Sequence, residues 1–148
     1  MPRFGKRVGK EKLEMGEHEN TELVQRTYGS FQSGDIPALL DSLSQDVEWV
    51  TAELEGVPVS GTWHGREQVG QFFQTLSDTQ EVRQLELREF VAQDDKVIAL
   101  GHYAWHVKAT GKVWESDFAH VCSVRDGKVT RFQEYADTAA LGDAFRKG

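Results

Sequence analysis

The spacing of apolar residues predicts helices in the first half of the chain. From Thr21 onward, apolar side chains recur at the intervals of one face of an amphipathic helix, which Gly34 ends. A second helix is predicted over residues 36–44, with Asp35 placed as its N-cap. A third helix is predicted over residues 64–78, because its apolar residues follow the same helical spacing.

Beyond Asp78 the pattern changes to the alternation of β-strands. A short strand is predicted earlier, over residues 46–52, and is followed by a loop rich in glycine and polar residues. The later strands are separated by DD, TG and DG turns and cover residues 82–96, 97–112, 113–128 and 129–137. Helices followed by long strands are typical of an α+β domain. We expect a cone-shaped α+β barrel, in which three N-terminal helices pack on the concave face of a curved antiparallel sheet around a ligand pocket.

Length and charge narrow the possible partners. The 148 residues fit one domain, and a net charge of −7 argues against a nucleic-acid partner. The exception is the basic start, so residues 1–18 are predicted to be a disordered tail and residues 19–148 the folded domain. Neither a membrane-length apolar segment nor a signal-peptide pattern occurs, which favours a soluble, cytoplasmic protein. Cys122 is the single cysteine, and no metal or nucleotide motif occurs, so neither metal nor cofactor is expected.

Four motifs follow one another along the chain: GDIPALL (34–40), DVEW (46–49), WHGREQVGQFF (63–73) and DFAHVCSVRDGKVTRFQEYADTAAL (117–141). In this order they resemble the SnoaL-like branch of the nuclear-transport-factor-2-like superfamily, which also contains ketosteroid isomerase. The resemblance implies a curved sheet around a conical cavity, usually in a homodimer, that binds small apolar molecules. It does not imply one reaction, because the fold hosts isomerases, cyclases, dehydratases, epoxide hydrolases and non-catalytic modules.

The resemblance also allows a comparison with catalytic positions of relatives. The general-base aspartate of ketosteroid isomerase falls on Thr51, its oxyanion-hole tyrosine on Thr27, and its protonated aspartate on His120. Neither threonine can do that chemistry, so steroid isomerisation by the family mechanism is not expected. Limonene-epoxide-hydrolase relatives need an arginine that the corresponding strand lacks. For the acidic residue of SnoaL-type cyclases, the sequence offers Glu134 or Asp137.

Strand parity sorts the side chains between the two faces of the sheet. On the strand predicted over residues 97–112, the resemblance implies that four alternate residues face the cavity: Gly101, Tyr103, Trp105 and Val107. His102 and His106 then lie on the other face, where exposure or a dimer interface is a better explanation than a metal site. On the next strand, Ser116, Phe118, His120 and Cys122 share one face.

The position of Glu134 relative to His120 depends on the turn between the last two strands. A three-residue loop with Gly127 in a left-handed bulge places His120 opposite Phe132, with Glu134 diagonal on the same face. A two-residue turn places His120 beside Gln133 instead. If they meet, His120 and Glu134 form an acid/base pair, with His120 as the acid/base and Glu134 as its partner. The alternative is that His120 makes a structural hydrogen bond that only polarises the pocket.

The remaining candidates are apolar or ambiguous. The predicted ligand-binding residues are Thr27, Phe31, Trp49, Thr51, Trp63, Phe72, Phe73, Tyr103, Trp105, Phe118 and Phe132, although most of the aromatic ones also serve as core. Asp137 is either an N-cap for a last helical turn, with Thr138 as its competitor, or a catalytic acid. Cys122 has no basic neighbour in sequence and is predicted to be inert.

Three functions follow from these observations. The first is acid/base catalysis of an isomerisation, cyclisation or dehydration on a small hydrophobic or aromatic molecule, with His120, Glu134 and Asp137 as catalytic candidates. The second is a binding or accessory module without chemistry, favoured by the threonines at the positions of the isomerase catalysts. The third is a protein-interaction domain that uses the same sheet.

Overall fold

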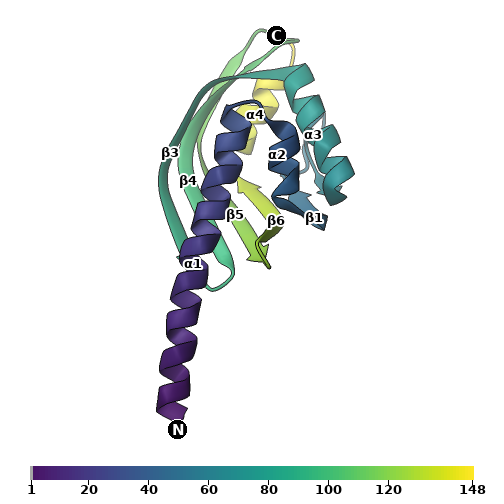
Figure 1. Ribbon diagram of the computed structural model, residues 1–148. Coiled ribbons are helices and arrows are strands. Elements are labelled where there is room, and N and C mark those ends of the chain that lie inside the picture. The colour runs from purple at the N-terminus through teal and green to yellow at the C-terminus, as the bar shows by residue number, and fades with distance from the viewer. Residues whose placement is uncertain (1) are drawn as a thin grey trace.

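The computed structural model describes the backbone of residues 2–148 and the side chains of residues 16–148. A curved sheet and the helices on its concave side form the molecule (Figure 1). In chain order the elements are α1 (Pro2–Gln32), α2 (Ile36–Asp41), β1 (Leu43–Val50), β2 (Thr62–His64), α3 (Gly65–Thr79), β3 (Gln80–Gln93), β4 (Lys96–Val107), β5 (Val113–Arg125), β6 (Lys128–Tyr135) and α4 (Thr138–Phe145). The predicted α+β cone is confirmed.

The sheet has six strands in the order β2-β1-β6-β5-β4-β3. It does not close, and its long strands β3, β4 and β5 curve around α1 (Figure 1). The sheet is antiparallel, as predicted, at every pair of neighbouring strands but one, since β1 runs parallel to β6. Strand β2 was not predicted, because three residues are too few to show an alternation.

The helices begin and end close to their sequence signals. Gly34 has a φ of 77°, which favours glycine and ends the helical path after α1. Asp35 caps α2, since its side chain accepts a hydrogen bond from the Ala38 backbone N–H at 3.1 Å. Helix α2 is shorter than predicted, because Leu43 already belongs to β1 and is fully buried there. The backbone of residues 2–18, which were predicted to be a disordered tail, is helical and continues into the rest of α1. The side chains of residues 1–15 lie outside the described residues, and the domain boundary at residue 19 stays a prediction.

The buried apolar side chains form two clusters. The most completely buried side chains are Leu39, Leu43, Val24, Val47, Val69, Val97, Val107 and Val129; Val107 belongs to the smaller cluster, with Trp105 and Trp114, and the others to the larger one. The larger cluster includes an aromatic layer, in which Trp49 and Phe132 stack with ring centroids 3.9 Å apart. Within the described part of the chain, no helix is long and apolar enough to cross a membrane.

Gly101 lies in the middle of β4, where its lack of a side chain lets the Glu86 carbonyl group and the Phe118 ring come close to the β4 backbone. A Cβ at this position would lie 2.2 Å from the Glu86 carbonyl oxygen and 2.6 Å from the Phe118 ring, which is far inside van der Waals contact. The Gly101→Ala variant is therefore expected to lose about 1–3 kcal/mol of unfolding free energy in urea denaturation. Gly29→Ala is the matched control, because Gly29 lies in α1 with no atom within 4 Å of its added Cβ. That variant is expected to gain stability, and an equal loss in both would contradict the explanation.

Candidate functional site

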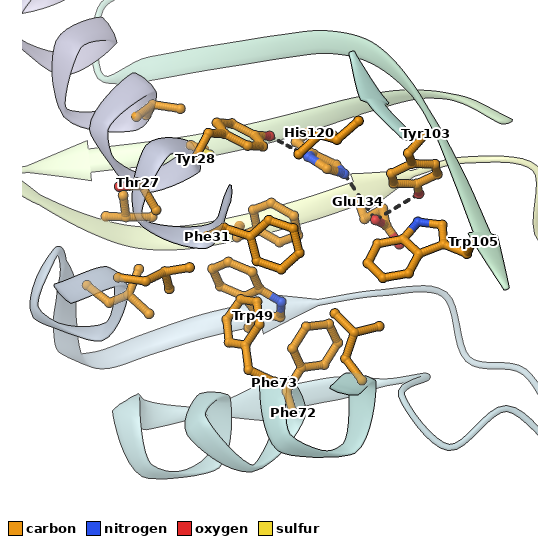
Figure 2. A pocket seen from close by; sticks show the side chains of 18 residues that line it. Thr27, Tyr28, Phe31, Trp49, Phe72, Phe73, Tyr103, Trp105, His120 and Glu134 are labelled. Carbon is orange, nitrogen blue, oxygen red and sulfur yellow. Dashed lines mark hydrogen bonds and ion pairs between the residues drawn. The ribbon is translucent and has the colours of Figure 1, made fainter. Parts of the chain in front are cut away.

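A cavity of about 100 Å³ lies between the concave face of the sheet and the helices. Of the predicted ligand-binding residues, eight line it: Thr27, Phe31, Trp49, Phe72, Phe73, Tyr103, Trp105 and Phe132 (Figure 2). Trp63 and Phe118 do not line it. Trp63 packs behind Phe72, and Phe118 packs behind Tyr103 and His120. Most of the wall is apolar, and the polar groups that reach it are few.

A second cavity of about 60 Å³ adjoins the first. Tyr103, Trp105 and Glu134 line both cavities, together with Phe72 and Leu76. The wall of the second cavity is more polar, since Thr51, Ser60, Gln80, Asp137 and Thr138 contribute to it. Thr51 therefore lies beside the second cavity and not the first.

The structure brings His120 and Glu134 together by a route that neither predicted turn describes. Asp126 and Gly127 form a two-residue turn, with φ values of 52° and 73°, between the paired residues Arg125 and Lys128. That turn alone would place His120 beside Gln133. A bulge on β6 then shifts the register by one residue, because Val124 pairs with Val129 while Ser123 pairs with Arg131.

As a result, His120 and Glu134 are direct cross-strand partners on the cavity face. His120 is 6% exposed, and its Nε2 atom lies 3.0 Å from the Glu134 Oε2 atom. The prediction of Phe132 opposite His120 was wrong, because it placed the extra residue in the turn. The extra residue lies within β6, near Thr130.

Four side chains form a hydrogen-bonded row along this wall: Tyr28, His120, Glu134 and Tyr103 (Figure 2). The Tyr28 hydroxyl bonds to Nδ1 of His120. The Tyr103 hydroxyl donates to the Glu134 Oε2 atom at 2.9 Å, so this single oxygen accepts from both His120 and Tyr103. Among the described residues, no hydrogen bond reaches the other carboxylate oxygen of Glu134.

Burial determines which way the protons point in this row. Desolvation, with a smaller effect of the Glu134 charge, raises the pKa of both Tyr28 and Tyr103 well above their ordinary value, so both remain phenols. A carboxylate only accepts, so His120 carries its proton on Nε2 and donates it to Glu134. In the neutral imidazole, the Nδ1 atom then accepts from the Tyr28 O–H. Each donor in the row thereby meets an acceptor, and both nitrogens of His120 are occupied.

Phe118 fixes the plane of the imidazole from behind. Its ring lies against the His120 ring with centroids 4.2 Å apart and an interplanar angle of 20°. The missing side chain of Gly101 leaves the space that the Phe118 ring uses. Phe118 thus supports the site without touching the cavity.

The two threonines at the isomerase positions serve the backbone. The Thr27 hydroxyl donates to the Leu23 carbonyl at 2.9 Å, as a helical threonine commonly does. The Thr51 hydroxyl lies 3.1 Å from the carbonyl oxygens of Val59 and Gly61, and so holds the loop after β1. Neither hydroxyl proton is left free for a ligand.

Tyr28 was missed as a site residue at the sequence level. It follows Thr27 on the predicted helical face, and the comparison with ketosteroid isomerase directed attention to the threonine. A helical stripe is wide enough for both residues to face the sheet. Tyr28 and His120 are 92 residues apart in the sequence, so only the folded structure shows that they are hydrogen-bond partners.

Asp137 is the N-cap of α4. Its side chain accepts from the Ala140 backbone N–H at 3.0 Å, which confirms the capping alternative and rules Thr138 out as the cap. His102 lies on the outer face, 2.8 Å from Asp117 and 3.2 Å from Glu115. Among the described residues, no three His, Cys, Asp or Glu side chains are grouped closely enough to hold a metal ion.

Cys122 is one of the residues that line the first cavity, and burial raises the pKa of its thiol to about 12. In the unfolded chain the thiol ionises near pH 9.0, so between these values only the folded state keeps the proton. Stability therefore falls as pH rises, by about 1.4 kcal/mol per pH unit for this group. At pH 10.5, relative to pH 8, we expect a loss of about 2 kcal/mol in urea denaturation from Cys122 alone.

The Cys122→Ala variant separates this effect from other alkaline titrations. It is expected to be less stable at pH 8, because a buried side chain has been shortened, but to lose about 2 kcal/mol less between pH 8 and 10.5 than the unchanged protein. Tyr28 and Tyr103 contribute in both proteins above pH 10. An identical pH dependence in the two proteins would contradict the role of Cys122.

Comparison with known proteins agrees with the geometry. Residues 24–132 match the model of the SnoaL-like domain. An NTF2-like (nuclear-transport-factor-2-like) protein from Burkholderia xenovorans LB400 is 32% identical, over 88% of this chain and 98% of that chain, with a TM-score of 0.81. TerC, solved in a co-crystal with polyporic acid, is 30% identical over 86% of this chain and 98% of its own, with a TM-score of 0.77.

An NTF2-like protein from Burkholderia thailandensis E264 is 25% identical over 86% of this chain and 97% of that chain, with a TM-score of 0.77. Comparison with proteins of curated function found no match. The family model covers well over half of the chain. In the structural comparisons, nearly the whole length of each similar protein is matched by this chain. The chain therefore belongs to the SnoaL-like family of NTF2-like proteins.

Proposed function

We propose that the protein binds a small hydrophobic molecule in its aromatic-lined cavity and performs acid/base chemistry on it, namely an isomerisation, cyclisation or dehydration. The observation that carries this proposal is the hydrogen-bonded row. It contains one carboxylate, Glu134, which lines both cavities and has one oxygen without a partner among the described residues. A carboxylate held in an apolar site is a suitable base for a proton on carbon or oxygen.

The row assigns different tasks to its members in this proposal. Glu134 takes the proton from the ligand and later returns it. His120 cannot do so while Tyr28 and Glu134 occupy its two nitrogens, so it acts as a positioning residue that orients the carboxylate. The N–H of His120 and the O–H of Tyr103 hold the Glu134 Oε2 atom, which leaves the other oxygen to face the ligand.

The aromatic walls support the same proposal. Trp49, Trp105 and Phe73 exclude water from the space opposite Glu134, and a lower local dielectric strengthens each polar interaction there. The proposed reactions involve no net oxidation or reduction, so no redox group is needed to complete them. Similarity to TerC makes polyporic acid a reasonable first ligand for testing.

A binding module without chemistry is the second candidate. It is favoured by the Thr27 and Thr51 hydroxyls, which donate to backbone carbonyls where the isomerase relatives have catalytic groups. The sequence-based expectation of a homodimer through the outer face of the sheet is compatible with either function. Light scattering on the purified chain tests that expectation.

The experiment that separates the two functions combines binding with proton exchange. Polyporic acid and small enolisable aromatic ketones are titrated into the protein by calorimetry, and the ketones are then followed by NMR in D₂O. Acid/base catalysis is expected to accelerate exchange of the protons next to the carbonyl over the rate in buffer. Binding without any acceleration for any bound ketone would favour the binding module.

A further inference from the structure

Gln80, at the start of β3, is a buried polar residue that the proposed function does not yet use. It is 4% exposed and lines the second cavity. The indole Nε1–H of Trp114 donates to the Gln80 side-chain oxygen at 2.9 Å. Because an indole nitrogen only donates, its partner must be the oxygen of the amide, and the orientation of the amide is fixed.

The Gln80 Nε2 atom is consequently turned away from Trp114. It makes no hydrogen bond to any residue from 16 to 148. Three side-chain polar atoms of the described residues lack a partner and are fully enclosed, and the Gln80 Nε2 atom is not one of them. It therefore keeps accessible surface, and for a residue this deeply buried that surface is the cavity wall. Buried amide groups are normally hydrogen-bonded, so an open donor at a cavity indicates an acceptor on the ligand.

The charges around both cavities restrict what that acceptor can be. Among the described lining residues there is neither a lysine nor an arginine, whereas Glu134 and Asp137 contribute carboxylates. An anionic ligand would be buried next to two acidic groups with no cation to compensate, which is unfavourable. An uncharged oxygen, such as that of a carbonyl group, meets the requirement of Gln80 without this cost.

We propose that the second cavity is the subsite for the carbonyl oxygen of an uncharged aromatic or cyclic ketone, whose ring occupies the first cavity, and that Gln80 donates a hydrogen bond to this oxygen. The inference rests on the proposed function for the role of Glu134, which lines both cavities at their junction. The two adjoining cavities, of about 100 and 60 Å³, together match the ~150 Å³ of an apolar cavity that holds benzene, so they suit a single ring with a short substituent.

This placement gives a balanced proton transfer. Glu134 takes a proton from the carbon next to the carbonyl, the C–H electron pair forms a C=C bond, and the carbonyl π pair moves onto the oxygen. The Gln80 N–H stabilises the enolate oxygen that results. Return of the proton from Glu134 to a carbon regenerates a ketone, and no other reactant is consumed.

The test compares three ligands of similar shape: acetophenone, its hydrocarbon analogue α-methylstyrene, and benzoate. In calorimetric titrations of the unchanged protein, acetophenone is expected to bind about tenfold more tightly than α-methylstyrene, as one neutral hydrogen bond allows. Benzoate is expected to bind at least tenfold more weakly than acetophenone. Equal affinities for acetophenone and α-methylstyrene, tight binding of benzoate, or binding of neither neutral probe at millimolar concentration would overturn the inference.

Two variants assign the preference to Gln80. Gln80→Glu keeps an oxygen for Trp114 and removes the amide donor, while Gln80→Met removes both polar atoms. Both are expected to reduce the preference for acetophenone to within about twofold of α-methylstyrene. Gln84→Glu is the matched control, because Gln84 is an exposed residue of the same strand, and it is expected to keep the preference. A preference that persists in both Gln80 variants would overturn the inference.

Deuterium exchange at the acetophenone methyl group, measured on the same samples, separates the two proposals. A Gln80-dependent binding preference without exchange would support the carbonyl subsite and count against acid/base catalysis. The opposite outcome is exchange that is lost when Glu134 is replaced, together with an acetophenone preference that is unchanged in the Gln80 variants. That outcome would support catalysis and overturn the subsite.

Discussion

The Glu134→Gln variant is expected to lose turnover by a factor of about 10²–10⁴ while it still binds the ligand. The amide is nearly the same size as the carboxylate, and its oxygen can still accept from His120 and Tyr103. It cannot take a proton from carbon, so only the chemical step is affected. Steady-state kinetics and calorimetry on one ligand, chosen for measurable exchange or conversion, give the two quantities separately.

Asp137→Asn is the control for this prediction. Asparagine is also a good N-cap, so α4 should remain capped through the hydrogen bond to Ala140. If Asp137 acts only as a cap, turnover is expected to stay within about twofold. A loss in Asp137→Asn comparable to that in Glu134→Gln would instead make Asp137 the catalytic acid, the other alternative that the sequence offered. An active Glu134→Gln variant would remove the basis of the proposed mechanism.

The Trp49→Ala variant is expected to lose about 3–5 kcal/mol of unfolding free energy in urea denaturation. Trp49 is 6% exposed and stacks on Phe132, with an interplanar angle of 9°. It also contacts Phe72 and Phe73, at centroid distances of 5.9 and 5.4 Å. Removing the indole therefore leaves a large gap in the aromatic layer, and the loss is a major fraction of the ~5–15 kcal/mol that stabilises a typical domain.

Trp63→Ala provides the comparison, since it removes the same side chain from a less enclosed site. Trp63 is only partly buried and packs against Phe72 at 5.7 Å, with its Nε1–H donating to the Val59 carbonyl at 3.3 Å. Its replacement is expected to cost less than half as much as that of Trp49. Equal losses would mean that the stacking on Phe132 contributes little.

The fold class could be predicted from the sequence because the pattern of buried and exposed residues is visible within each short stretch of chain. Alternation along residues 97–112 and 113–128 places the aromatic residues and His120 on the inner face, and the structure buries those positions. The capping of the short helices was also readable, since Asp35 and Asp137 act on backbone N–H groups three residues away. Such features need only the local chain.

The candidate site was predictable only in part. His120 and Glu134 were identified as possible partners, but neither expected register was right: the three-residue loop placed Phe132 opposite His120, and the two-residue turn, which is the one observed, placed Gln133 there. A bulge within β6 is invisible to a pattern of period two, since one inserted residue changes the alternation over a stretch too short to notice. Gln80 was overlooked for a related reason, because a glutamine at a helix-to-strand junction looks exposed in sequence.

Which residues turn inward can be read from the chain alone, because apolar side chains must recur with the period of each helix or strand in order to be buried together. Which polar groups meet depends on how the elements pack. The row from Tyr28 to Tyr103 joins α1, β5, β6 and β4, and the Trp114–Gln80 bond joins β5 to β3. Hydrogen bonds need atoms within about 3 Å, and that precision comes from the register and curvature of the whole sheet.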